Sequence, residues 1–125
     1  MSPASPDRAA LGRQAEELAC NFLQRRGLIL VERNYRCRQG ELDLIMRDGN
    51  ATVFVEVRYR GNTSLVDAAT SVDHAKQGRL VAAAQHYLQR HPRAADYPCR
   101  FDVVAVAPAA GQNRVEWITN AIELQ

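Results

Sequence analysis

The chain contains almost no lysine. Of its sixteen basic residues, fifteen are arginine and Lys76 is the only lysine. Arginine is a permanent cation at neutral pH, whereas a lysine side chain loses its proton when its surroundings disfavour the charge. Any chemistry that needs a side-chain amine therefore depends on Lys76.

A long apolar run is also missing. No stretch of the 125 residues approaches the roughly 18 consecutive apolar residues that a membrane-spanning helix needs. Residues 1–6 are small and polar with no apolar core behind them, which is unlike a secretion signal. We therefore expect a cytoplasmic protein without a membrane partner, made of a flexible segment over residues 1–10 and a single domain over residues 11–125.

Cysteine is scarce, and its spacing points to no bound metal. Cys20, Cys37 and Cys99 are odd in number and do not follow the spacings of zinc ligands. Isolated cysteines are most often small buried hydrophobic side chains. We expect neither a disulfide nor a zinc site.

Acidic side chains do occur inside two strongly apolar runs, residues 40–45 and residues 53–58. An ionised carboxylate that is buried loses several kcal/mol of hydration unless a cation or several donors receive it. Asp43 in the first run and Glu56 in the second are therefore the first candidates for a functional site.

The segment between these two runs contains an Asp-Gly pair, which is typical of a tight hairpin turn. A turn centred on this pair places Glu41 opposite Glu56, and a turn centred one residue later places Asp43 opposite Glu56. Side chains alternate along a strand, so both registers predict the three acids on one face of the sheet. Leu42 and Leu44 are then expected on the other face.

Carboxylates that face each other repel and raise each other's pKa, which destabilises the fold unless something positive lies between them. A divalent cation is one explanation, because Mg²⁺ takes oxygen ligands at about 2.0–2.1 Å and usually accepts one or two protein carboxylates. A structural ion pair with Arg58 or another arginine is the alternative. Both explanations fit the residues.

Basic residues are concentrated between residues 25 and 38, where five arginines stand against the single acid Glu32. Such a patch suits a polyanion, because each neutralised phosphate releases condensed counterions. A solvated face without a ligand is an equally good interpretation of the charge alone. The candidate nucleic-acid-binding residues are Arg25, Arg26, Arg33, Arg36 and Arg38, with Arg60 on a later strand.

Apolar periodicity predicts the element order α-β-β-β-α-β-β, an α/β fold with a mixed sheet flanked by helices. We expect helices over residues 7–26 and from residue 71 or 73 to residue 90, and strands over residues 28–35, 40–47, 51–60, 100–106 and 114–118. The fourth strand follows a helical crossover and should lie parallel to its neighbour. Helical projection places Glu16 beside the sheet, with Lys76 and Gln77 leaning over its acids.

Asp102 also interrupts an apolar strand. Buried polar groups in proteins usually have hydrogen-bond partners, and Arg100 is a near neighbour along the same strand. We therefore expect Asp102 to be structural.

In their order and spacing, several short strings resemble the YraN family, also called UPF0102. Its members look like compact relatives of the PD-(D/E)xK nucleases and of archaeal Holliday-junction resolvases. The strings are GRQAEELA from residue 12, NYRCR from residue 34, GELDLI from residue 40, FVEVRYR from residue 54, KQ from residue 76 and RFDVV from residue 100. The resemblance implies a restriction-endonuclease-like core and phosphodiester hydrolysis.

The resemblance also implies roles for individual residues. Asp43 matches the acid of the first motif, Glu56 and Arg58 occupy the E-x-K motif, and Glu16 matches the helix acid of the resolvase-like group. In this pattern Asp43 and Glu56 hold one Mg²⁺ or Mn²⁺, and Glu16 supports the ion or its water.

One position departs from the pattern, because Arg58 stands where the motif has lysine. Arginine stabilises negative charge but does not accept a proton at neutral pH. Lys76 is the expected substitute for the missing amine, with Gln77 positioning it or the nucleophile. A lysine and glutamine at the start of a helix that simply face solvent are the alternative.

The expected function is a metal-dependent nuclease, or a nuclease-like DNA-processing protein, that acts on branched or single-stranded DNA. The alternative is a nucleic-acid-binding or protein-docking module that keeps this fold and has little or no activity. A resolvase role would also imply a homodimer, because it needs two active sites related by symmetry.

Overall fold

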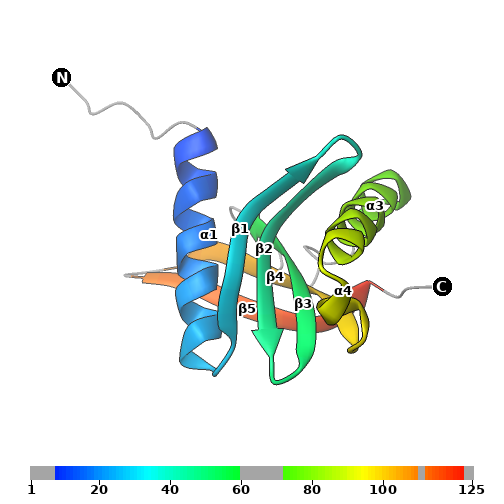
Figure 1. The fold of residues 1–125 in the computed structure, drawn as a ribbon. Coiled ribbons are helices and arrows are strands. Elements are labelled where there is room, and N and C mark those ends of the chain that lie inside the picture. The colour runs from blue at the N-terminus through cyan, green and yellow to red at the C-terminus, as the bar shows by residue number, and fades with distance from the viewer. Residues whose placement is uncertain (1–7, 60–71, 110–111, 123–125) are drawn as a thin grey trace.

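The computed structural model describes residues 8–59, 72–109 and 112–122, which form a five-stranded sheet with helices on both faces (Figure 1). The helices are α1 (Arg8–Arg25), α3 (His74–Arg90) and the short α4 (Pro92–Ala95). The strands are β1 (Ile29–Cys37), β2 (Gly40–Asp48), β3 (Ala51–Tyr59), β4 (Cys99–Ala109) and β5 (Gln112–Ile122). No helix in these ranges is long and apolar enough to cross a membrane.

The predicted element order is confirmed, with one addition. The short helix α4 between α3 and β4 was not predicted. Residues 8–10, assigned from the sequence to the flexible segment, belong to α1. Residues 1–7 lie outside the described residues, as does Arg60.

The strands lie in the order β1-β2-β3-β4-β5. Three neighbouring pairs are antiparallel, and β4 lies parallel to β3 after the α3 crossover. The predicted parallel pairing is therefore confirmed. This mixed five-stranded sheet flanked by helices is an α/β fold consistent with a restriction-endonuclease-like arrangement.

Each face of the sheet packs against its own helix (Figure 1). On one face, α1 covers an apolar cluster that includes Ala19, Leu23, Leu44, Met46, Val53, Val55, Val104 and Val106. On the other face, α3 covers a cluster that includes Leu42, Ile45, Phe54, Leu80, Tyr87, Phe101 and Val103. Both faces of the central strands are thus buried, which explains their continuous apolar runs.

The ends of both main helices follow from local sequence signals. After α1, Gly27 has a φ of 96°, a left-handed conformation that favours glycine. At the start of α3, the Asp73 carboxylate accepts a hydrogen bond from the backbone N–H of Lys76 at 2.8 Å. This N-cap fixes the first turn of α3 and therefore the place from which the Lys76 side chain extends.

The β2–β3 hairpin adopts the second of the two predicted registers. Asp48 pairs with Ala51, and the pairing runs as far as Leu44 and Val55. Continued by one residue, this register sets Asp43 across from Glu56.

The prediction for Leu42 is wrong, because its side chain joins the α3-side cluster instead of the α1-side cluster. The alternation along β2 breaks at Asp43, where the pairing with β3 ends and the Asp43 carboxylate accepts the Val57 N–H. Beyond that point β2 stays paired with β1 alone, through Leu42 and Tyr35.

Candidate active site

Asp43 lies where β2 parts from β3. Its carboxylate Oδ2 accepts a hydrogen bond from the backbone N–H of Val57 at 2.9 Å. Burial raises the pKa of Asp43, and this effect outweighs the Val57 hydrogen bond and the attraction of Lys76, which both lower it. The carboxyl group is thus held at a fixed point between the two strands.

Glu56 lies on β3 and is 6% exposed. Its Oε1 atom is 3.5 Å from the Lys76 ammonium. Its Oε2 atom is buried and, within the described part of the chain, has no hydrogen-bond partner. A buried carboxylate oxygen without a donor is unusual and needs an explanation.

The charge of Asp43 acts on the ionisation of Glu56. Burial, followed by repulsion from Asp43, raises the pKa of Glu56 from an ordinary value of 4.5 to about 7. The positive charges of Lys76 and Arg58 oppose this shift without cancelling it. A buried carboxyl group whose ionised form is disfavoured by burial and by a neighbouring acid favours the binding of positive charge.

Glu16 approaches the same place from α1. Partial burial raises the pKa of Glu16, and the negative charges of Asp43 and Glu41 raise it further. Arg33 and Arg36 act in the opposite direction. The helix acid predicted from the sequence is therefore within electrostatic reach of Asp43.

This donor set fits a hard divalent cation supported by two carboxylates. Across residues 8–59, 72–109 and 112–122, no group of three or more His, Cys, Asp or Glu side chains is placed to hold a metal ion. Mg²⁺ usually binds through one or two protein carboxylates and keeps water or substrate phosphate in its other positions. Asp43 and Glu56 meet that requirement, and the Glu56 Oε2 atom has the free lone pairs that a cation takes.

Lys76 contacts Glu56 as predicted, whereas the Gln77 side chain is bound to the backbone at the start of α3. The Gln77 side-chain amide donates a hydrogen bond to the Val72 carbonyl at 2.8 Å. This contact joins the first turn of α3 to the residue before its N-cap. A catalytic role for Gln77 stays a prediction.

The arginines predicted to bind nucleic acid do not form one patch. Arg25 and Arg26 lie at the end of α1, where the Arg26 guanidinium stacks 3.6 Å from the centre of the Phe22 ring. Arg36 and Arg38 lie at the other end of β1, which has nine residues. A strand of that length spans roughly 30 Å, so proximity in sequence does not bring these pairs together.

Two of these arginines form ion pairs. Arg33 contacts Glu17 at 2.7 Å on the exposed side of α1. Arg36 contacts Glu41 across the β1–β2 hairpin at 3.3 Å. The part that these arginines play in nucleic-acid binding stays a prediction.

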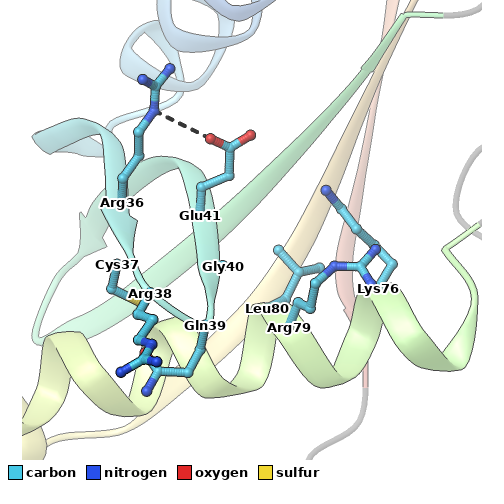
Figure 2. A pocket seen from close by; sticks show the side chains of 9 residues that line it. All are labelled: Arg36, Cys37, Arg38, Gln39, Gly40, Glu41, Lys76, Arg79 and Leu80. Atoms are coloured by element: carbon cyan, nitrogen blue, oxygen red, sulfur yellow. Dashed lines mark ion pairs between the residues drawn. The ribbon is translucent and has the colours of Figure 1, made fainter.

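A groove of about 390 Å³ lies between the tip of the β1–β2 hairpin and the first turns of α3 (Figure 2). Its lining includes Arg36, Arg38, Glu41, Lys76, Arg79 and Leu80. Sequence reasoning missed Arg79. Its position three residues after Lys76 puts it on the same side of the helix, and that spacing was the available signal.

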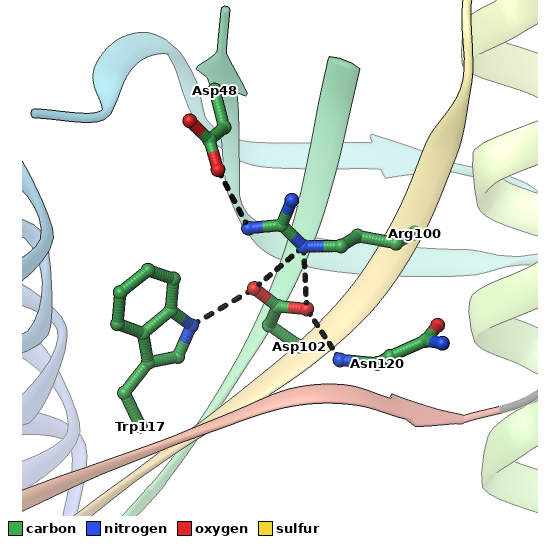
Figure 3. Close-up of polar contacts among 5 residues, drawn as sticks. All are labelled: Asp48, Arg100, Asp102, Trp117 and Asn120. Carbon is green, nitrogen blue, oxygen red and sulfur yellow. Dashed lines mark hydrogen bonds and ion pairs between the residues drawn. The ribbon is translucent and has the colours of Figure 1, made fainter.

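Asp102 has the structural role that was predicted. It is fully buried, and its carboxylate accepts hydrogen bonds from the Arg100 Nε (3.1 Å), the Trp117 indole (2.8 Å) and the Asn120 backbone N–H (2.8 Å). Arg100 also contacts Asp48 at 3.1 Å, as Figure 3 shows. The network links β4 and β5 to the turn between β2 and β3.

Comparison with known proteins places this site within one family of sequences. The model of "Uncharacterised protein family UPF0102" matches residues 15–106. A UPF0102 protein of Nitrosococcus oceani is 53% identical over 114 residues, which cover 91% of this chain and 92% of that protein. A UPF0102 protein of Stutzerimonas stutzeri is 54% identical over 112 residues, covering 90% and 93%. One of Pseudomonas aeruginosa is 50% identical over 114 residues, covering 90% and 91%.

Proposed function

The chain belongs to the uncharacterised protein family UPF0102, and we propose that it is a metal-dependent nuclease of the cytoplasm that hydrolyses phosphodiester bonds in branched or single-stranded DNA. The observation that carries this proposal is the group formed by Asp43, Glu56 and Lys76. It combines the partly buried Asp43 carboxylate and the buried Glu56 carboxylate, whose Oε2 atom has no partner among the described residues, with the chain's single side-chain amine.

Asp43 and Glu56 would hold one Mg²⁺ or Mn²⁺, and Glu16, on which the charge of Asp43 acts, would support the ion or its water. When bound, such an ion polarises the scissile phosphate and lowers the pKa of a coordinated water. The raised pKa values of both acids support the assignment, because burial, the largest cause of both shifts, disfavours an uncompensated carboxylate, and a bound cation would compensate that charge.

Lys76 takes the place of the lysine that the E-x-K motif lacks here. Its ammonium group comes from α3 instead of β3 and still lies 3.5 Å from Glu56 Oε1. Arg58 remains in the motif position, and its charge lowers the pKa of both acids. Lys76 would orient the attacking water or stabilise charge that develops on the phosphate, and Arg58 would act only by electrostatic attraction.

The direct test is cleavage of a DNA panel in the presence of Mn²⁺. Flaps, four-way junctions, single strands and duplexes are incubated with the wild-type protein and with the Asp43→Ala/Glu56→Ala double variant. We expect metal-dependent cleavage of a branched or single-stranded substrate and at least a 100-fold loss in the double variant, a loss typical for removal of a main catalytic group. The exposed Asp96→Ala variant is the matched control. Absence of cleavage, or cleavage that persists in the double variant, contradicts the proposal and favours a binding module.

The same assay tests the two cations. Lys76→Ala should abolish cleavage, and Arg58→Lys should increase it because the amine returns to the motif position. Arg90→Ala removes a cation from the far end of α3 and should leave the rate unchanged. Unchanged rates in the Lys76 and Arg58 variants would remove both side chains from the mechanism.

A further inference from the structure

We propose that the groove between the β1–β2 hairpin and α3 is a phosphate-binding subsite that binds a single-stranded segment of nucleic acid beside Asp43 and Glu56. The inference rests on the proposed function, since it names the form of substrate that this site receives. It assigns the contact with the strand to Arg38, already a candidate from the sequence, and adds Arg79.

The groove shares the Lys76 side chain with the candidate active site. One wall is the hairpin tip, from Arg36 to Glu41, and the other is the start of α3 with Lys76 and Arg79 (Figure 2). Lys76 lines the groove and also contacts Glu56. A strand lying in the groove would therefore contact the Lys76 ammonium, which is itself 3.5 Å from Glu56 Oε1.

The groove carries an excess of positive charge. Among the described residues, four cations line it, and Glu41 is the one acid. Arg36 is paired with Glu41 and Lys76 with Glu56. Arg38 and Arg79 form no ion pair with any residue whose position the structure describes. Two uncompensated guanidinium groups that face one groove match the spaced negative charges of a phosphate backbone.

The width of the groove is fixed by contact between two backbones. A Cβ atom added to Gly40 would lie only 2.8 Å from the Arg79 carbonyl oxygen, so the hairpin rests against the helix at this point. Because backbone meets backbone, a change of side-chain rotamer cannot separate the two walls.

The size of the groove suits one strand. Its volume of about 390 Å³ is near the lower end of the roughly 300–1,000 Å³ typical of ligand sites, enough for a nucleotide unit. A duplex would have to place both of its strands against these walls. We therefore assign the groove to a single-stranded segment, such as the arm of a branched substrate.

Equilibrium binding without divalent ions tests this assignment separately from cleavage. A fluorescent single-stranded oligonucleotide and a duplex of the same sequence are titrated in EDTA with the wild type and with Arg38→Ala/Arg79→Ala. We expect the wild type to bind the single strand at least tenfold more tightly than the duplex. The double variant should lose at least tenfold in single-strand affinity, and its salt slope should fall by about 1.4, because each phosphate contact on a single strand contributes about 0.7. Thermal melts confirm that the variant is folded.

Two further variants make the result specific. Arg90→Ala, which removes an exposed arginine from the last turn of α3, should change affinity less than twofold. Arg38→Lys/Arg79→Lys should restore most of the affinity and the salt slope, because the charge returns. Equal affinity for single strand and duplex, or unchanged binding by the alanine variant, overturns the subsite while leaving the Mn²⁺ cleavage result standing. If the binding results hold and cleavage fails, the nuclease proposal alone is overturned.

Discussion

Glu56 is a buried acid whose charge opposes folding and is also suited to binding a cation. Burial and the neighbouring Asp43 both oppose its ionisation, while a lysine at 3.5 Å favours it. The balance leaves a carboxyl group whose pKa of about 7 lies close to neutral pH. When such a group is charged, it destabilises the fold because its charge is buried and uncompensated. A cation that compensates this charge is bound readily for that reason.

This balance predicts a dependence of stability on pH in the absence of metal. The pKa of Glu56 is raised in the folded protein, from 4.5 to about 7, so the folded state binds more protons than the unfolded state between these values. The wild-type free energy of unfolding should therefore fall as pH rises from 4.5 through 7. Glu56→Gln does not titrate and should exceed the wild type by about 1–3 kcal/mol at pH 8, with a smaller difference at pH 5.

Urea unfolding in EDTA at a series of pH values measures this difference. Glu116→Gln, an equivalent change on the edge strand β5, is the control and should leave the wild-type pH profile in place. If the free energies of Glu56→Gln and the wild type run parallel from pH 5 to pH 8, Glu56 does not carry a raised pKa.

Residues of the site differ in how well the sequence reveals them. Asp43 and Glu56 could be predicted because a carboxylate inside an apolar strand conflicts with its surroundings. Arg79 was missed, because its spacing from Lys76 indicates a shared side of the helix but does not show which element lies opposite that side. That element is the hairpin tip at Gly40, a tertiary contact that local patterns do not encode.

At the scale of elements, the close approach of the β1–β2 hairpin to α3 is the contact that shapes the groove. Gly40 has little freedom for a larger side chain, because an added Cβ would meet the Arg79 carbonyl oxygen and carbon at 2.8 and 3.2 Å. Neither atom can move without the helix backbone.

Gly40→Ala should therefore lower the free energy of unfolding by about 1–3 kcal/mol, the usual effect of overpacking against a rigid neighbour. The matched control is Gly78→Ala on α3, where nothing lies within 4 Å of the added Cβ. That substitution should stabilise the protein by about 0.5–1 kcal/mol, because alanine favours a helix more than glycine does. Urea unfolding compares the two, and a Gly40→Ala protein as stable as the wild type would show that the hairpin moves freely.

Periodicity and helix caps predicted the helices and strands well. They predicted the strand register and the faces of individual side chains less completely. The Asp73 cap and the glycine after α1 set helix ends that agree with the sequence within a residue or two. The Asp-Gly turn left two registers open, because the choice depends on pairing along the whole hairpin. Leu42 was placed on the wrong face, since the prediction assumed that β2 stays paired with β3, and that pairing ends at Leu44.

At the scale of the whole molecule, the two faces of the sheet carry different polar groups. Glu56 contacts Lys76 of α3 on one face. Asp102 pairs in register with Val55, whose side chain belongs to the α1-side cluster, and contacts Trp117 from the same cluster. The network around Asp102 can therefore stabilise the sheet without taking part in the candidate site.

Asp102→Ala should remove about 3–5 kcal/mol from the free energy of unfolding, because it leaves Arg100 without its buried partner and two N–H donors without an acceptor. Asp102→Asn keeps the volume and one acceptor oxygen, so its loss should be smaller. The free energy of unfolding, measured in urea, should be highest in the wild type, lower in Asp102→Asn and lowest in Asp102→Ala. The exposed Asp96→Ala variant should be close to the wild type.

Under conditions where all remain folded, the Asp102 variants should cleave DNA at the wild-type rate. A selective loss of cleavage in a folded Asp102→Asn protein would show that the two faces are coupled, because the network would then hold the carboxylates of the opposite face in place.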